Sequence, residues 1–197
     1  MLRIYIVQKI LNFFDFFQQK KIFNFLKKKI KKKSIFFDVG AHYGETIKNI
    51  YKNFKVDQIH SFEASLENFE ILKKRILNQN LNVKLNCLGL SNKKKISSIN
   101  QSLESSSTTL SRINRNSRYY KMKLHTLGIS EHSKYIKNKK VKLDTLDNYI
   151  KRNNKIKKID LLKIDTEGHE LYVLFGAKNS LSKIRLIYFE HHYDDML

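Results

Sequence analysis

The fold of this chain is indicated first by residues 34–46, which read SIFFDVGAHYGET. The run Ser34–Val39 is rich in residues that favour strands, and a helical pattern follows at about 46–54. Between them, Gly40 and Gly44 let the backbone turn tightly and approach a ligand closely. The N-terminus of the following helix offers N–H donors to a carboxylate or a phosphate. The segment therefore predicts a strand, a ligand-binding glycine loop and a helix.

The same alternation continues along the chain. Strand-like runs lie at 58–63, 82–88, 158–165 and 183–190, and helical patterns of period 3.6 lie at 66–78 and 168–177. Strands that alternate with helices are typical of a parallel sheet with crossover helices. We therefore predict an α/β fold, with a mostly parallel sheet and helices on its faces.

Residues 91–157 interrupt this rhythm. Ser97–Ser111 is rich in serine and threonine and is expected to form a loop, while 121–126 and 139–143 are candidate short strands and 144–150 a candidate short helix. A loop of this length is usually functional or disordered. Two interpretations stay open: a flap over the active site, or a mobile surface insertion.

Three acidic residues, Asp38, Glu63 and Asp165, mark the ends of three predicted strands. In an open α/β sheet, ligands bind beyond the carboxyl ends of the strands. Glu63, about 20 residues after the glycine loop, suits hydrogen bonding to ribose hydroxyls. The pattern D-x-G-x-x-x-G puts Asp38 where a cationic methionine group is attracted and a pyrophosphate is repelled. S-adenosylmethionine is therefore favoured over a nicotinamide cofactor.

Seven segments together resemble the FkbM-type methyltransferases, a family of class I S-adenosylmethionine-dependent O-methyltransferases. In family order they are FFDVGAHYGET (36–46), IHSFEAS (59–65), CLGLSN (87–92), ESSSTTL (104–110), VKLDTLDNYI (141–150), LLKIDTEGHELYVLFGA (161–177) and IYFEHH (187–192). The resemblance covers about residues 34–192. It implies a Rossmann-like fold with sheet order 3-2-1-4-5, normally completed by a sixth and a seventh strand.

The resemblance also implies roles for residues of this chain. The cofactor's glycine loop would be formed by Asp38, Gly40, Ala41 and Gly44, and the helix start after it by Glu45 and Thr46. Glu63 would bind the ribose, and Leu88–Ser91, which includes Gly89, would lie against the adenine. Asp165 would lie near the methionine end and the transferred methyl group. The sequence ends seven residues after Glu190. We therefore expect the last strand pair to be missing, and the exposed sheet edge makes a homo-oligomer one expectation.

Methyl transfer to a hydroxyl group requires in-line alignment and benefits from a general base. Asp165 and His169 are the first candidates, ahead of the other acids and histidines near the strand ends: Glu167, Glu190, His191 and His192. The alternative for His169 is a solvent-facing residue at a helix start. For Glu167 and Glu170 it is an acid that complements the helix dipole. The tail 190–195 has side chains that suit a divalent metal with Asp165, but we predict no metal.

The net charge of the 197-residue chain is +21, from 39 Lys and Arg against 18 Asp and Glu. The abundance of Lys, Asn, Ile and Phe is typical of an AT-biased genome, so a solvated lysine surface is favoured over a nucleic-acid partner. Cys87 is the single cysteine, is expected to be a small core residue, and fits a reducing, cytoplasmic location.

Residues 1–33 form a basic amphipathic helical segment, with Arg3 and nine lysines against Asp15. Polar residues interrupt it too often for a transmembrane helix, and no cleavage site of a secretory signal follows. One interpretation is an interfacial helix at the inner membrane surface. The other is a helix packed on the domain formed by residues 34–197.

The function predicted is S-adenosylmethionine-dependent O-methylation of a small molecule, a saccharide or a glycan precursor. The chain has no proline, which excludes two proline-containing motifs of base methyltransferases. Two alternatives stay open. One is a ribose methyltransferase acting on RNA, and the other is a truncated, non-catalytic protein that binds at a membrane.

Overall fold

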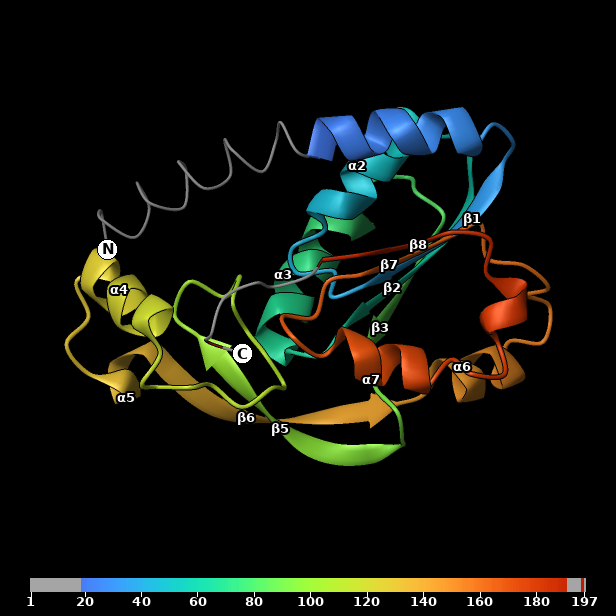
Figure 1. Cartoon of the computed structure of the whole chain (residues 1–197). Coiled ribbons are helices and arrows are strands. Elements are labelled where there is room, and N and C mark those ends of the chain that lie inside the picture. Colours follow the sequence, from blue (N-terminus) through green and yellow to red (C-terminus); the bar gives the residue numbers. More distant parts are fainter. Residues whose placement is uncertain (1–18, 191–195, 197) are drawn as a thin grey trace.

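The computed structural model of the protein describes residues 19–190 and Met196, and its centre is a five-stranded parallel sheet (Figure 1). The sheet runs in the order β3-β2-β1-β7-β8, which is the predicted order 3-2-1-4-5. Its strands are β1 (Ser34–Val39), β2 (Val56–Glu63), β3 (Val83–Cys87), β7 (Leu161–Ile164) and β8 (Ile187–Phe189). All neighbouring pairs are parallel. The predicted α/β class is confirmed.

Helices cover both faces of this sheet, because successive side chains of a strand point to opposite faces. Phe36 packs in a cluster with the helix at 19–29, α2 (Glu45–Asn53) and α3 (Leu66–Leu77). Its neighbour Phe37 packs on the other face. The helices of that face are α6 (Leu146–Arg152) and α7 (Glu170–Phe175), and the short 3-10 helix η1 (Leu181–Lys183) precedes β8.

The helix at 19–29 is part of the core of the domain. Phe23, Leu26 and the following Ile30 are buried against the sheet. The described half of the basic N-terminal segment therefore packs on the domain, as one of the two interpretations predicted. Residues 1–18 lie outside the described residues, so contact with a membrane stays a prediction. In the described part of the chain, no helix is both long and apolar enough to cross a membrane.

The insertion and the preceding strand β4 form a second, smaller sheet with two short helices at its end. Its strands β4 (Gly89–Leu90), β6 (Ile136–Asp144) and β5 (Lys95–Ser102) lie in that order, and β5 and β6 are antiparallel. The helices are α4 (Arg118–Leu127) and α5 (His132–Tyr135). The predicted strand at 139–143 and helix at 144–150 are present in β6 and α6.

Two predictions for the insertion are wrong. Residues 121–126 lie in α4 and not in a strand, because Ser117 caps the N-terminus of the helix and Gly128 ends it in the left-handed conformation. The expected serine-rich loop begins later than predicted, because β5 pairs with β6 as far as Ser102.

The prediction that Cys87 is a core residue is also wrong. Cys87 is exposed and is the last residue of β3, which is an edge strand of the sheet. An edge strand has a neighbour on one side alone, so its last residue has less to pack against.

Candidate functional site

The three predicted strand-end acids lie at the carboxyl edge of the large sheet. Asp38 ends β1 and Glu63 ends β2, and both side chains are buried. Asp165 follows β7 and is partly exposed. Because β1 lies between β2 and β7, the structure brings these carboxylates to the place where the sheet order reverses. Ligands of open α/β sheets bind at this place.

Lys163 lies between Asp38 and Asp165 and was not among the site residues predicted from the sequence. Its Nζ atom is 3.0 Å from Asp165 Oδ2 and 3.4 Å from Asp38 Oδ1. Burial alone would lower the pKa of Lys163, but the two carboxylates outweigh burial and raise it above its ordinary value. The ammonium group is therefore charged at neutral pH.

Asp38 carries a buried carboxylate that lacks hydrogen-bond donors. Among the described residues, neither of its oxygens has a hydrogen-bond partner, and its side chain forms an ion pair with Lys163. Burial raises the pKa of Asp38, and the Lys163 charge opposes that rise. Buried polar atoms are normally hydrogen-bonded, so an unsatisfied carboxylate fits a ligand that brings N–H donors.

The glycine loop passes close to the loop that follows β7. Gly40 has a φ of 80°, and a Cβ atom there would lie 1.7 Å from the carbonyl oxygen of Asp165. No side chain fits at this position, which explains the first glycine of the motif. Gly44, with a φ of 89°, begins α2 without a side-chain cap.

Glu63 links the glycine loop to the start of α3 through hydrogen bonds. Its Oε2 accepts a hydrogen bond from the backbone N–H of His42, and its Oε1 accepts one from Ser65, both at 2.9 Å. Burial raises the pKa of Glu63, and these two bonds oppose the rise. Each oxygen keeps a lone pair for a further donor, such as a ribose hydroxyl.

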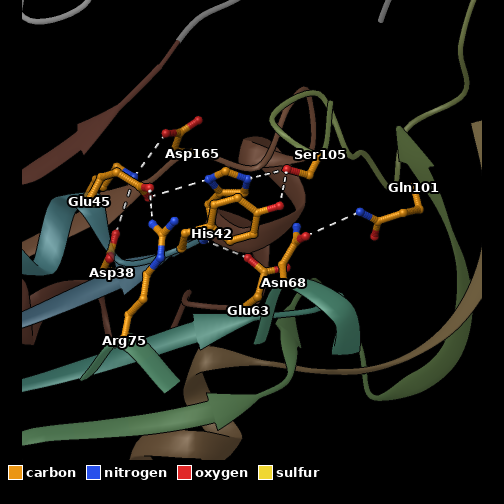
Figure 2. A network of polar contacts seen from close by, with 11 residues as sticks. Asp38, His42, Glu45, Glu63, Asn68, Arg75, Gln101, Ser105 and Asp165 are labelled. Atoms are coloured by element: carbon orange, nitrogen blue, oxygen red, sulfur yellow. Dashed lines mark hydrogen bonds and ion pairs between the residues drawn. The ribbon is translucent and has the colours of Figure 1, made fainter. Parts of the chain in front are cut away.

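The insertion contacts the glycine loop through Ser105 (Figure 2). The Ser105 hydroxyl lies 2.7 Å from His42 Nε2 and donates to the Tyr43 hydroxyl at 2.8 Å. The His42 ring stacks on the Tyr43 ring. The guanidinium group of Arg75 also lies over the Tyr43 ring, 4.8 Å from the ring centroid. Arg75 also bonds Glu45. The insertion is thus joined to the predicted cofactor loop, and its role as a flap stays a prediction.

The insertion also holds the loop after β7. Thr109 Oγ1 donates to the carbonyl of Glu167, and Ser111 Oγ donates to that of Gly168 at 2.8 Å. Within this loop, Glu170 Oε1 accepts hydrogen bonds from Thr166 N, Thr166 Oγ1 and Gly168 N. Glu170 lies in the first turn of α7, so its carboxylate acts as the helix N-terminal acid that the sequence suggested.

Backbone strain gathers around the same site. In the part of the chain that the structure describes, the non-glycine residues with positive φ are His42 (47°), Ser105 (61°) and Glu167 (51°). One comes from the glycine loop, one from the insertion and one from the loop after β7. Each residue in such a conformation costs about 1–3 kcal/mol, and such residues are concentrated at functional sites.

Burial shifts the pKa values of Glu167 and His169 in opposite directions. Burial, joined by the nearby Asp165 charge, raises the pKa of Glu167 to about 8. Burial lowers the pKa of His169 to about 4, and its Nε2 lies 3.0 Å from the hydroxyl of the buried Ser91. The alternative of a solvent-facing His169 is therefore wrong, while its catalytic role stays a prediction.

The remaining predicted site residues lie around this centre. Ala41 is buried in the glycine loop, Thr46 lies in the first turn of α2, and Gly89 packs against Leu143 of the insertion sheet. Within residues 19–190, no three histidine, cysteine or acidic side chains are placed to hold a metal. His191 and His192 lie outside the described residues.

Comparison with known proteins gives one family match. A family model described as the methyltransferase FkbM domain matches residues 38–196. No curated protein matches the chain. Among solved structures, the crystal structure of methyltransferase FkbM from Methylobacillus flagellatus KT matches at 16% identity and a TM-score of 0.47. The match covers 76% of this chain and 30% of that one.

Proposed function

Since the chain belongs to the FkbM methyltransferase family, we propose that it transfers the methyl group of S-adenosylmethionine to a hydroxyl group of a small acceptor, a saccharide or a glycan precursor. The observation that carries the cofactor assignment is the buried Asp38 carboxylate, which has no hydrogen-bond donor among the described residues. A cationic cofactor with N–H donors satisfies this group, whereas a pyrophosphate would be repelled by it.

The residues at the strand ends fit the parts of this cofactor. Glu63 has acceptor capacity left for the ribose hydroxyls after its two backbone bonds. Gly40 allows close approach where any side chain would collide with the Asp165 carbonyl. Asp38 and Asp165 offer negative charge to the methionine ammonium group. When bound, the cofactor supplies an electrophilic methyl group on a sulfonium centre.

Proton removal from the acceptor falls to a carboxylate in the loop after β7. Asp165 is partly exposed at the end of that strand, and its ion pair with Lys163 holds its position. Glu167 lies nearby, and its pKa of about 8 lets it gain and lose a proton near neutral pH. His169 is less suited to this role, because its Nε2 is engaged with Ser91 and its pKa is about 4.

The test is transfer of radiolabelled methyl groups from S-adenosylmethionine to a panel of saccharides, nucleotide sugars and lipid-linked saccharides, with mixed RNA as a competing substrate. We expect label in a saccharide acceptor, and the label should survive alkali because a methyl ether is stable where a methyl ester is cleaved. Label in RNA alone would favour the ribose alternative. Alkali-labile label would replace the hydroxyl acceptor with a carboxylate.

A further inference from the structure

We propose that Lys163 binds the α-carboxylate of the cofactor's methionine arm, at the end of a small pocket beneath the N-terminal helix. The inference rests on the proposed function, because it assigns one more residue to the same cofactor. It also gives Lys163 a direct contact with the ligand, beyond the balancing of the charges of Asp38 and Asp165.

The pocket lies between the helix at 19–29, α2 and the strands β7 and β8, and it includes Asp165 and Glu190, which follow these two strands. Its volume is about 40 Å³. A single water needs about 10–15 Å³ on this measure, so the pocket has room for a carboxylate or an ammonium group and not for a nucleoside. It therefore suits the end of a ligand whose larger part lies elsewhere on the sheet edge.

The side chains around the pocket provide both signs of charge. Lys163 supplies the cation, Asp165 and Glu190 supply carboxylates, and Phe23 and Leu26 close the pocket from the helix. The two acids outweigh the lysine, so a simple anion would be repelled, whereas a simple cation would offer Lys163 no acceptor. An amino acid end, with an ammonium and a carboxylate on one carbon, matches both.

Lys163 has donor capacity left for such a ligand. An ammonium group has three N–H donors. Asp165 and Asp38 engage at most two of them, in ion pairs at 3.0 Å and 3.4 Å. At least one donor of a residue that lines the pocket therefore stays available.

The start of α2 adds a second source of positive potential. Thr46, which also lines the pocket, lies in the first turn of this nine-residue helix. No side chain hydrogen-bonds the helix N-terminus, so its dipole adds positive potential there, and Glu45 in the first turn offsets part of that potential. A carboxylate between Lys163 and this helix end is stabilised from two sides.

The competing role for Lys163 is to keep Asp38 and Asp165 ionised without touching the ligand. The two roles differ when the ligand lacks its carboxylate. If Lys163 binds the carboxylate, removing the lysine lowers the affinity for S-adenosylmethionine and S-adenosylhomocysteine more than the affinity for decarboxylated S-adenosylmethionine. If Lys163 acts through the aspartates alone, all three ligands lose affinity together.

The experiment is calorimetric titration of wild type, Lys163→Met and Lys163→Arg with these three ligands. The control is Lys178→Met, which removes an exposed lysine in the turn after α7. For Lys163→Met we expect a loss of at least about tenfold for the two ligands that carry the carboxylate, the size of a charge-assisted hydrogen bond. The arginine variant should retain part of the affinity, and the control should match wild type.

An equal loss for decarboxylated S-adenosylmethionine would overturn the inference and leave the proposed function standing. Wild type also tests the inference without any variant, because it must bind decarboxylated S-adenosylmethionine at least about tenfold more weakly than the intact cofactor. Equal affinities would overturn it even if Lys163→Met does not fold. Failure of folded wild type to bind any of the ligands would overturn the proposed function together with this inference.

Discussion

Asp38 and Lys163 are register partners on the neighbouring parallel strands β1 and β7, and their side chains form an ion pair at 3.4 Å away from solvent. Two charges on one sheet face are costly to bury, and a buried ion pair is weak evidence for stability. Its position at the strand ends, beside the glycine loop, indicates that this pair serves a ligand.

The first prediction concerns the charge of Asp38. Asp38→Asn keeps the shape of the side chain but removes its negative charge and replaces one acceptor oxygen with an NH₂ donor, which cannot bind the methionine ammonium group. We expect the affinity for S-adenosylmethionine to fall at least about tenfold by calorimetry, the size of a hydrogen bond to a charged group. Asp57→Asn is the matched control, since Asp57 is exposed and pairs with Lys33. Equal affinity of Asp38→Asn and wild type would remove Asp38 from the site.

The second prediction concerns Glu63 and the glycine loop. In Glu63→Gln, one of the two backbone N–H groups, of His42 or Ser65, meets an amide NH₂ in place of an oxygen. We expect a loss of about 1–3 kcal/mol of unfolding free energy, measured by urea titration, together with weaker cofactor binding. Glu70→Gln, on the exposed side of α3, should change neither. A stable variant with unchanged affinity would contradict both roles.

The third prediction is a pH dependence from Glu167. Because its pKa is raised to about 8, the folded protein holds a proton that the unfolded chain releases above the ordinary glutamate range. Between about pH 4.5 and 8 the folded state therefore binds more protons, and the free energy of unfolding falls as the pH rises. Glu167→Gln has no carboxyl group to ionise. Its thermal midpoint should fall less than that of wild type over this range.

The matched control for this pH series is Glu131→Gln, which removes an exposed carboxylate that pairs with Lys134. Its midpoints should follow those of wild type at every pH. If the thermal midpoints of Glu167→Gln and wild type change in parallel from pH 5 to pH 8.5, the raised pKa of Glu167 is wrong. The argument for this residue as a proton acceptor would then fail as well.

The fourth prediction concerns the contact between the insertion and the glycine loop. Ser105→Ala removes the hydroxyl that bonds His42 Nε2 and the Tyr43 hydroxyl. We expect a destabilisation of about 1 kcal/mol and faster amide hydrogen exchange in residues 97–111. Ser106→Ala, at the exposed neighbouring position, is the control. Unchanged exchange in Ser105→Ala would show that this contact does not hold the insertion in place.

The sheet was predictable because its strands are short apolar runs that end in acids or glycines. The alternation of Phe36 and Phe37 between two cores follows from the pleat alone. The order of the strands came from the family resemblance. The N-terminal helix was predictable as helix, but its place on the sheet depended on Phe23 and Leu26 finding a partner.

The insertion and Lys163 were harder to predict for physical reasons. Lys121, Lys123 and His125 alternate with apolar residues as in a strand, and the capping by Ser117 outweighs that pattern. A lysine inside a short strand normally indicates a solvent-facing position. The signal for its burial was the spacing Lys163-x-Asp165, which puts both side chains on one face beside Asp38.

The central claim is that the carboxyl edge of this sheet binds S-adenosylmethionine, and calorimetric titration of the wild-type chain tests it most directly. NAD is the control ligand, because its pyrophosphate would meet the Asp38 carboxylate. We expect binding of S-adenosylmethionine in the micromolar range and no heat from NAD. Absence of S-adenosylmethionine binding by a protein that unfolds cooperatively, or equal binding of NAD, would contradict the account.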